Sequence, residues 1–159
     1  MKSSAQTAMA AVGNDMYLDS CIIVKLVSYE PDSAAYHGIV AGKPVVTSEL
    51  AVAEVRSALL TKERAGRISI HARQTGWRLF QEKVRNEEFF LLPLNRHVIE
   101  RAGALIDQCH PKVALRTMDA IHVATAELCG GEEMCSGDKR VQKASDFIGL
   151  ALAPQARTD

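Results

Sequence analysis

Short apolar runs alternate with longer helical segments along the chain, and this alternation limits the possible folds more than any other feature. The runs MYL, VVT, FFLLPL and EEMC are typical of strands, at residues 16–18, 45–47, 89–94 and 132–135. FFLLPL is the strongest signal of a buried strand, and LALA at 150–153 is a candidate fifth strand. Strands separated by ten or more helical residues predict an α/β domain with a mainly parallel sheet.

The segments between these runs carry the apolar spacing of helices. They cover residues 21–30, 32–41, 49–60, 68–86, 95–109, 115–128 and the region after Gly137. Ser48 is placed to cap the third of these helices, with Glu49 in its first turn. Asn95 opens the fifth helix, and the pair Gly130 and Gly131 ends the sixth.

Length and composition favour one domain of ordinary size. A chain of 159 residues with 47% apolar and 24% charged residues is long enough for one core. We expect a domain at residues 16–152, a flexible extension at 1–15 and a flexible tail at 153–159. No run approaches the roughly 20 apolar residues of a membrane span, and residues 1–15 lack the apolar block of a secretory signal. The four cysteines show no zinc-binding spacing, which predicts buried thiols in a reducing cytoplasm.

Four carboxylates stand where the predicted elements would bring them together. Asp19 and Asp138 come just after the strands MYL and EEMC, and polar sites in parallel sheets form outside the carboxyl ends of strands. Asp119 lies between two apolar neighbours near the start of a helix, and Glu54 lies at the margin of an apolar helical stripe. We therefore expect these four side chains to face one crevice.

A crevice with four carboxylates requires positive charge. Each close pair would cost about 4 kcal/mol at a separation of roughly 4 Å and an effective dielectric of about 20. Hard oxygen ligands, without suitably spaced His or Cys, favour Mg²⁺ or Mn²⁺, which keep several waters for a phosphate substrate. The arrangement predicts metal-assisted hydrolysis of a phosphodiester, with the four acids as catalytic metal ligands.

Each acid also has an ordinary structural explanation. Asp19 and Asp138 are typical turn or cap residues after a strand. Asp119 could cap a helix, and Glu54 could be a solvated side chain. Glu49, five residues before Glu54, is an alternative ligand. The ordered set of four acids, rather than any one of them, favours a metal site.

Four segments, taken in order, resemble the PIN-domain family, and most closely its VapC-type toxins from toxin–antitoxin pairs. They are YLDSCIIVKL, TSELAVAEVRSAL, LRTMDAIHVATA and CSGDKRVQKAS, and the likeness covers about residues 16–152. The resemblance implies a three-layer α/β/α sandwich with a mainly parallel central sheet, and an RNA-cleaving site dependent on Mg²⁺ or Mn²⁺. The residues that it implies for this site are Asp19, Glu54, Asp119 and Asp138, with Ser136 able to hold a ligand or a water.

The resemblance also implies partners for the chain. These are an RNA substrate, a cognate antitoxin protein and a second copy of the chain in a homodimer. Two other functions stay open, namely a PIN ribonuclease of RNA processing or decay without an antitoxin, and a non-catalytic RNA-binding or regulatory module on the same scaffold. A small antitoxin reading frame just upstream of the gene is expected for a toxin, and a measurement of Mn²⁺ affinity tests the non-catalytic module.

Three polar residues close to the acids in sequence have less specific roles. Ser20 is predicted to orient a water or to cap the following helix, and Arg116 to contact a substrate phosphate or one of the acids. His122 lies one helical turn after Asp119. We interpret it as a partly buried helix residue, because no nucleophilic Ser or Cys is paired with it.

One stretch of the chain is strongly basic. Residues 61–85 hold seven Lys and Arg against two Glu, a local charge of +5 in a chain that is neutral overall. We interpret this stretch as a solvated helix pair whose cations could also hold RNA phosphates near the acidic site. Its apolar stripe of Trp77, Phe80 and Val84 is predicted to belong to the core.

Overall fold

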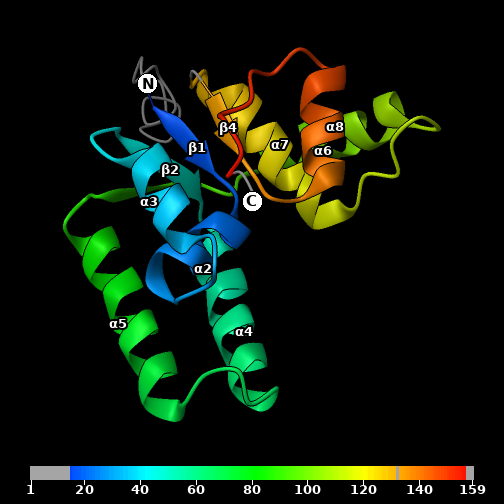
Figure 1. The fold of residues 1–159 in the computed structure, drawn as a ribbon. Helices are drawn as coiled ribbons and strands as arrows, with labels where there is room; N and C mark the ends of the chain where they lie inside the picture. The colour runs from blue at the N-terminus through cyan, green and yellow to red at the C-terminus, as the bar shows by residue number, and fades with distance from the viewer. Residues whose placement is uncertain (1–14, 132, 157–159) are drawn as a thin grey trace.

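The computed structural model describes residues 15–131 and 133–156 (Figure 1). The strands of this part of the chain are β1 Met16–Leu18, β2 Val45–Ser48, β3 Phe89–Leu92 and β4 Glu133–Cys135. Its helices are α2 Ser20–Val27, α3 Ser33–Val40, α4 Leu50–Arg64, α5 Ile70–Arg85, α6 Arg96–Cys109, α7 Thr117–Cys129 and α8 Lys139–Phe147. Apart from Asp15, the predicted extension lies outside the described residues, as do Glu132 of the predicted fourth strand and residues 157–159 of the predicted tail.

The strands form one parallel sheet in the order β3-β2-β1-β4. Met16 pairs with Val45 of β2 on one side and with Glu133 of β4 on the other. Leu18, the last residue of β1, pairs with Cys135, the last residue of β4. The predicted α/β domain with a mainly parallel sheet is therefore confirmed. Because β1 and β4 are parallel, the segments that follow them leave the sheet together at the carboxyl ends of the strands.

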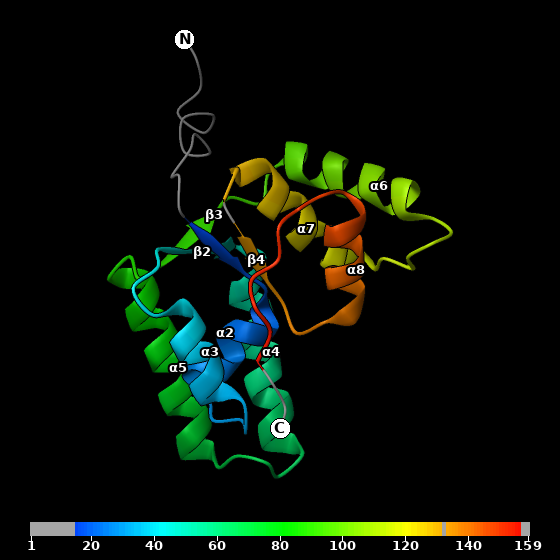
Figure 2. The same cartoon turned by 45° about the horizontal axis from the view of Figure 1, so that its top comes forward.

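Helices cover both faces of the sheet and form the expected three-layer sandwich (Figures 1 and 2). On one face, Met16 and Leu18 belong to an apolar cluster with residues of α2, α3, α4 and α5. On the other face, Tyr17 and Met134 pack with residues of α6, α7 and α8. Successive residues of β1 enter different cores because side chains alternate between the two faces of a strand. A strand buried on both faces reads as a continuous apolar run, which is why MYL carries no polar residue.

Two strand predictions are corrected by the structure. FFLLPL is not the most buried strand, because β3 lies at the edge of the sheet and Phe90 is 43% exposed. An apolar run indicates burial but does not distinguish a central strand from an edge strand. LALA is reduced to a single parallel bridge between Leu152 and Met134. That bridge is held by two backbone bonds, from Met134 N–H to the Ala151 carbonyl and from Ala153 N–H to the Met134 carbonyl.

The caps predicted at Asn95 and Gly130 are confirmed, whereas α4 begins at Leu50, so that Glu49 takes the N-cap position predicted for Ser48 and lies before the first turn. Ser48 Oγ accepts a hydrogen bond from the backbone N–H of Leu50 at 3.1 Å, and the side chain of Asn95 accepts from that of Val98. Gly130 ends α7 in the left-handed conformation. In the described part of the chain, no helix is long and apolar enough to cross a membrane.

The predicted thiols are present, and one of them is less buried than expected. All four cysteines are free, and Cys109, Cys129 and Cys135 are buried, whereas Cys21 is only partly buried. Cys21 lies in the first turn of α2, which borders the site described below.

Helix α5 packs closely against α2 at Gly76. A Cβ atom at this position would lie 2.7 Å from the carbonyl oxygen of Val27 and 3.4 Å from Cδ2 of Leu59. Such a contact with backbone cannot be relieved by a rotamer change, so the two helices would have to separate. Gly103 in α6 is a natural control, because a Cβ there would meet no atom within 4 Å.

We expect Gly76→Ala to lower the free energy of unfolding by about 1–3 kcal/mol, since overpacking a closed contact outweighs the gain in helix propensity. Gly103→Ala should raise it by about 0.5–1 kcal/mol, because only helix propensity changes there. Urea denaturation of both variants measures the difference. Equal stability changes at the two positions would contradict the close packing of α5 on α2.

Candidate functional site

Two of the predicted site residues follow neighbouring strands. Asp19 comes directly after β1 and Asp138 shortly after β4, and each stands at the N-terminal end of a helix, α2 and α8. Asp138 Oδ1 accepts hydrogen bonds from the backbone N–H groups of Arg140 at 2.7 Å and Val141 at 3.4 Å. The partial positive charge of a helix N-terminus favours a carboxylate at such a position.

Ser136 joins the two segments that carry these acids. Its hydroxyl donates to Asp19 Oδ2 at 2.6 Å and accepts from the backbone N–H of Asp138 at 3.0 Å. Ser136 is fully buried and Asp19 is 7% exposed. The hydrogen bond holds the Asp19 carboxylate in one orientation, and the predicted contact of Ser136 with a ligand or a water stays a prediction.

Asp119 brings a third carboxylate to this place from the first turn of α7. Its Oδ2 atom is buried and has no hydrogen-bond partner among the residues that the structure describes. Burial raises the pKa of Asp119, and the charges of Asp138 and Asp19 raise it further, while Arg116 and His122 act in the opposite direction. The three aspartates therefore repel one another, and one of their oxygens lacks the partner that a buried polar atom requires.

Glu54 reaches the same region from α4 and is held by His122. Nε2 of His122 lies 2.7 Å from Glu54 Oε1, 3.2 Å from the hydroxyl of Ser20 and 3.7 Å from Asp19 Oδ1. Nδ1 lies 2.7 Å from the Tyr17 hydroxyl. Because a carboxylate only accepts, Nε2–H is the donor to Glu54, and the imidazole fixes the position of this carboxylate.

The environment of His122 is strongly anionic. Burial by itself lowers the pKa of this imidazole, but its hydrogen bond to Glu54 and the charges of Asp19, Glu54 and Asp119 outweigh burial, so the pKa is raised. His122 is 1% exposed. The prediction of a partly buried helix residue underestimated the burial of His122 and missed that it stands among the acids. The available signal was its position one turn after Asp119 in a helix buried on nearly every side.

The accessory residues lie near the acids in different ways. Ser20 is buried and its hydroxyl faces His122. Arg116 is exposed at the start of α7, and its charge acts on Asp119. Glu49, the alternative to Glu54, is directed elsewhere, because its Oε2 accepts from the backbone N–H of Leu94 at 3.0 Å. The structure thus places Glu54, and not Glu49, beside the aspartates.

The donor chemistry of the site fits a hard divalent cation. Its candidate ligands are carboxylate oxygens, and Asp119 Oδ2 is a buried acceptor without a donor. Within residues 15–131 and 133–156, no group of three or more His, Cys, Asp or Glu side chains is already arranged to hold a metal ion. The acids are therefore gathered at one edge of the sheet without forming a closed coordination shell.

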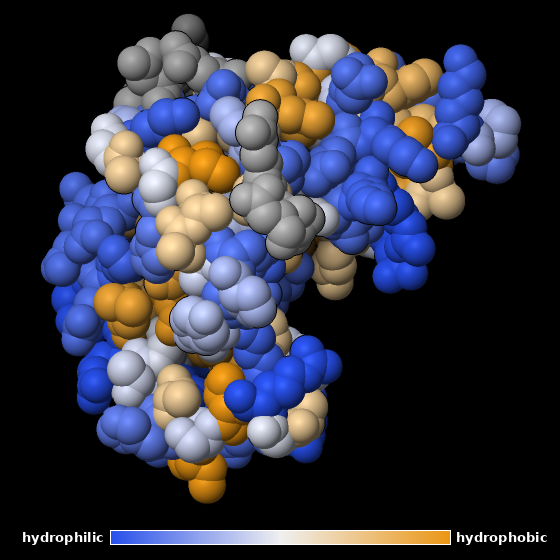
Figure 3. Space-filling model, viewed as in Figure 1, coloured by the Kyte–Doolittle hydropathy of each residue, from blue (hydrophilic) through white to orange (hydrophobic). Residues whose placement is uncertain are grey.

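One side of the molecule is hollowed in the view of Figure 3. Helix α4 borders the hollow on one side, and the start of α8 lies on the other (Figures 1 and 3). Mostly hydrophilic residues surround it in this view.

The sequence pattern of the PIN domain matches residues 16–146, which contain all four acids. The chain belongs to the PIN domain family. A curated relative, Ribonuclease VapC46 of Mycobacterium tuberculosis, is 37% identical over 147 residues, covering 91% of this chain and 97% of that protein.

Two solved structures share the PIN fold of this chain. They are FitAcB from Neisseria gonorrhoeae, with a TM-score of 0.62 and 16% identity, and VapBC2 from Rickettsia felis bound to a DNA fragment from their promoter, with a TM-score of 0.62 and 14% identity. Each comparison covers 87% of this chain and 96% of the other. At these identities the likeness concerns the fold alone.

We expect His122→Ala to lower the free energy of unfolding by about 2–4 kcal/mol, because it opens a cavity and leaves the Tyr17 hydroxyl and Glu54 without their partner. His97→Ala, at an exposed position of α6, should change it by less than about 0.5 kcal/mol. Thermal and urea denaturation measure both. A His122→Ala protein as stable as His97→Ala would show that the imidazole does not organise the site.

Proposed function

We propose that this PIN domain is a Mg²⁺- or Mn²⁺-dependent endoribonuclease, and that it is the toxin of a toxin–antitoxin pair acting on RNA in the cytoplasm. The observation that carries the proposal is the buried, unpartnered Asp119 oxygen beside Asp19 and Asp138 at one edge of the sheet. The relative named Ribonuclease VapC46 supports the same activity. A cluster of mutually repelling carboxylates has no structural benefit by itself, whereas it is what a cation-dependent hydrolase needs.

The proposed cation ligands are Asp19, Asp119 and Asp138, with Glu54 as the fourth acid. A bound divalent cation would offset the charge of these acids and of a phosphodiester, and would acidify an attacking water. Ser136 keeps one Asp19 oxygen in place, and His122 holds Glu54 by the Nε2–H bond. Arg116, exposed beside Asp119, is available to a phosphate oxygen of the substrate.

The role of each acid follows from its surroundings. Asp138 has one oxygen committed to the start of α8, and Asp19 has one oxygen committed to Ser136. Each of these residues therefore has a second oxygen that is not used in that bond and could serve as a cation ligand. Preorganised ligands of this kind avoid the cost of ordering side chains when a cation or substrate arrives.

The proposed protein partner is an antitoxin, and the proposed assembly is a homodimer. The solved structure of VapBC2 from Rickettsia felis bound to a promoter DNA fragment shares the fold of this chain. A PIN ribonuclease of RNA processing would carry the same acids, so the site does not separate it from a toxin. Expression of the chain alone and together with the product of the adjacent upstream gene separates them: a toxin arrests growth alone and is relieved by its neighbour.

We expect Asp119→Asn to reduce kcat for cleavage of an RNA oligonucleotide in Mn²⁺ by at least about a hundredfold, because it removes one anionic ligand. The melting temperature without metal should not fall, since the substitution relieves repulsion and breaks no bond of the unpartnered oxygen. Millimolar Mn²⁺ should raise the melting temperature of the original protein more than that of the variant.

Asp107→Asn is the matched control, because Asp107 is exposed on α6 and the same change there should leave cleavage and the Mn²⁺ effect intact. Cleavage by Asp119→Asn at the original rate would refute the assignment of the site. A wild-type protein that neither responds to Mn²⁺ nor cleaves RNA would instead favour the non-catalytic module.

A further inference from the structure

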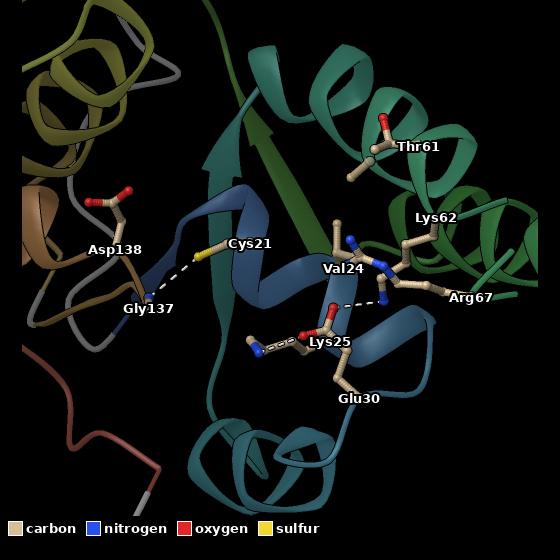
Figure 4. A pocket seen from close by; sticks show the side chains of 10 residues that line it. Cys21, Val24, Lys25, Glu30, Thr61, Lys62, Arg67, Gly137 and Asp138 are labelled. Carbon is tan, nitrogen blue, oxygen red and sulfur yellow. Dashed lines mark hydrogen bonds and ion pairs between the residues drawn. The ribbon is translucent and has the colours of Figure 1, made fainter. Parts of the chain in front are cut away.

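A pocket of about 480 Å³ opens beside Asp138 (Figure 4). It lies between α2, α4 and the loop from β4 to α8, and Asp138 forms part of its wall. Cavities of roughly 300–1,000 Å³ are typical of sites for small ligands. Because Asp138 belongs both to the pocket and to the acidic site, a ligand in the pocket lies next to the place of the proposed reaction.

The two ends of the pocket have opposite charge. Figure 4 shows Asp138 at one end and Lys62 and Arg67 at the other, with α2 between them. Arg67 follows α4 in the turn that leads to α5. Glu30 lies at the same end as these two cations.

Most of the cations near this end are already neutralised. Lys62 Nζ lies 2.7 Å from Glu30 Oε1, and Lys25 Nζ lies 2.7 Å from Glu30 Oε2 and 2.8 Å from Asp32 Oδ1. Arg67 forms no ion pair with any residue that the structure describes. One positive charge is therefore available to a ligand, and it belongs to Arg67.

Other cations of the basic stretch are placed differently. Arg73 pairs with Glu63 and Lys83 with Glu88, and neither of these cations lines the pocket. Arg78 is exposed on α5 and also lies outside the pocket wall. Among the seven cations of residues 61–85, only Lys62 and Arg67 line the pocket.

The wall between the charged ends holds the paired Lys25 and several neutral residues. Cys21 and Val24 of α2 face Ala58 and Thr61 of α4. Burial and the charge of Asp19 raise the pKa of the Cys21 thiol to about 12, so the thiol stays protonated. The neutral residues of this wall, with the Thr61 hydroxyl, suit the sugar and base of a nucleotide, whose anionic phosphate lies at one end of the molecule.

We propose that this pocket binds the nucleotide adjacent to the scissile phosphate, with Arg67 holding the flanking phosphate of the RNA. This inference rests on the proposed ribonuclease function. The guanidinium is suited to the role because its planar donors match phosphate oxygens and its charge is not already paired. Arg67 would thus attract RNA toward carboxylates that would otherwise repel it.

Steady-state cleavage of a short single-stranded RNA in Mn²⁺, over a series of salt concentrations, tests the inference with the full chain. Arg67→Ala should raise KM about five- to tenfold and change kcat by less than about twofold. The plot of log kcat/KM against log salt should become shallower by about 0.7, the contribution of one phosphate contact in single-stranded RNA. Arg78→Ala, the same change outside the pocket, should leave KM and the slope near their original values.

A second variant distinguishes binding of a nucleotide in the pocket from electrostatic attraction of RNA by Arg67. Ala58→Leu fills part of the wall without changing charge and leaves a good helix former in α4. It should raise KM while leaving the salt slope unchanged, with a melting temperature that shows an intact fold. An unchanged KM in Ala58→Leu would mean that no nucleotide enters the pocket.

The outcomes distinguish this inference from the proposed function. Cleavage by the original protein, with Arg67→Ala and Arg78→Ala behaving alike, overturns the nucleotide subsite and leaves the ribonuclease assignment intact. Absence of cleavage by the original protein overturns both. If Arg67→Ala leaves KM and the salt slope unchanged but weakens binding to the co-expressed product of the adjacent gene, the pocket docks a protein and not RNA.

Discussion

The parallel pairing of β1 with β4 is the constraint on which the site depends. Because Leu18 and Cys135 are paired at the ends of these strands, Asp19 and the segment 136–138 emerge together at one edge of the sheet. Ser136 then binds both sides of this junction through its hydroxyl. The cost of placing carboxylates so close together is offset in part by the helix N-termini at which Asp19 and Asp138 stand, and the two apolar cores keep the strands in register.

The hydrogen bonds of His122 connect the acidic site to the core. Tyr17 is buried on the face of the sheet covered by α6, α7 and α8, and its hydroxyl meets Nδ1 of His122. On its other side the same imidazole holds Glu54, which comes from α4 in the opposite layer. A single buried ring therefore links β1, α4 and α7. A network of this kind is stable only when each polar member has its partner, so the packing of the core and the orientation of Glu54 depend on each other.

The cations of the basic stretch, residues 61–85, have different roles because their tertiary contacts differ. Arg73 and Lys83 form ion pairs at the surface, and Lys62 forms an ion pair with Glu30 beside the pocket. Surface pairs of this type contribute little to stability, but they decide which cations remain available to a ligand. Arg67 remains without an ion pair among the described residues, at the end of a pocket whose other end is Asp138. The net charge of the stretch does not show which of its cations are paired within the described residues and which one lies unpaired at the pocket.

Local patterns determined most of the elements of this protein: the apolar periods, the cap at Asn95 and the ordered acids are properties of nearby residues. They also indicated Asp19 and Asp138, because a carboxylate that directly follows a strand of a parallel sheet lies at the carboxyl end of that sheet, where sites form. Only the tertiary structure decided that β3 is an edge strand, that LALA forms a single bridge, that His122 belongs among the acids and that Arg67 lies by a pocket. These features depend on which distant segments meet, and the periodicity of one segment does not specify its neighbours.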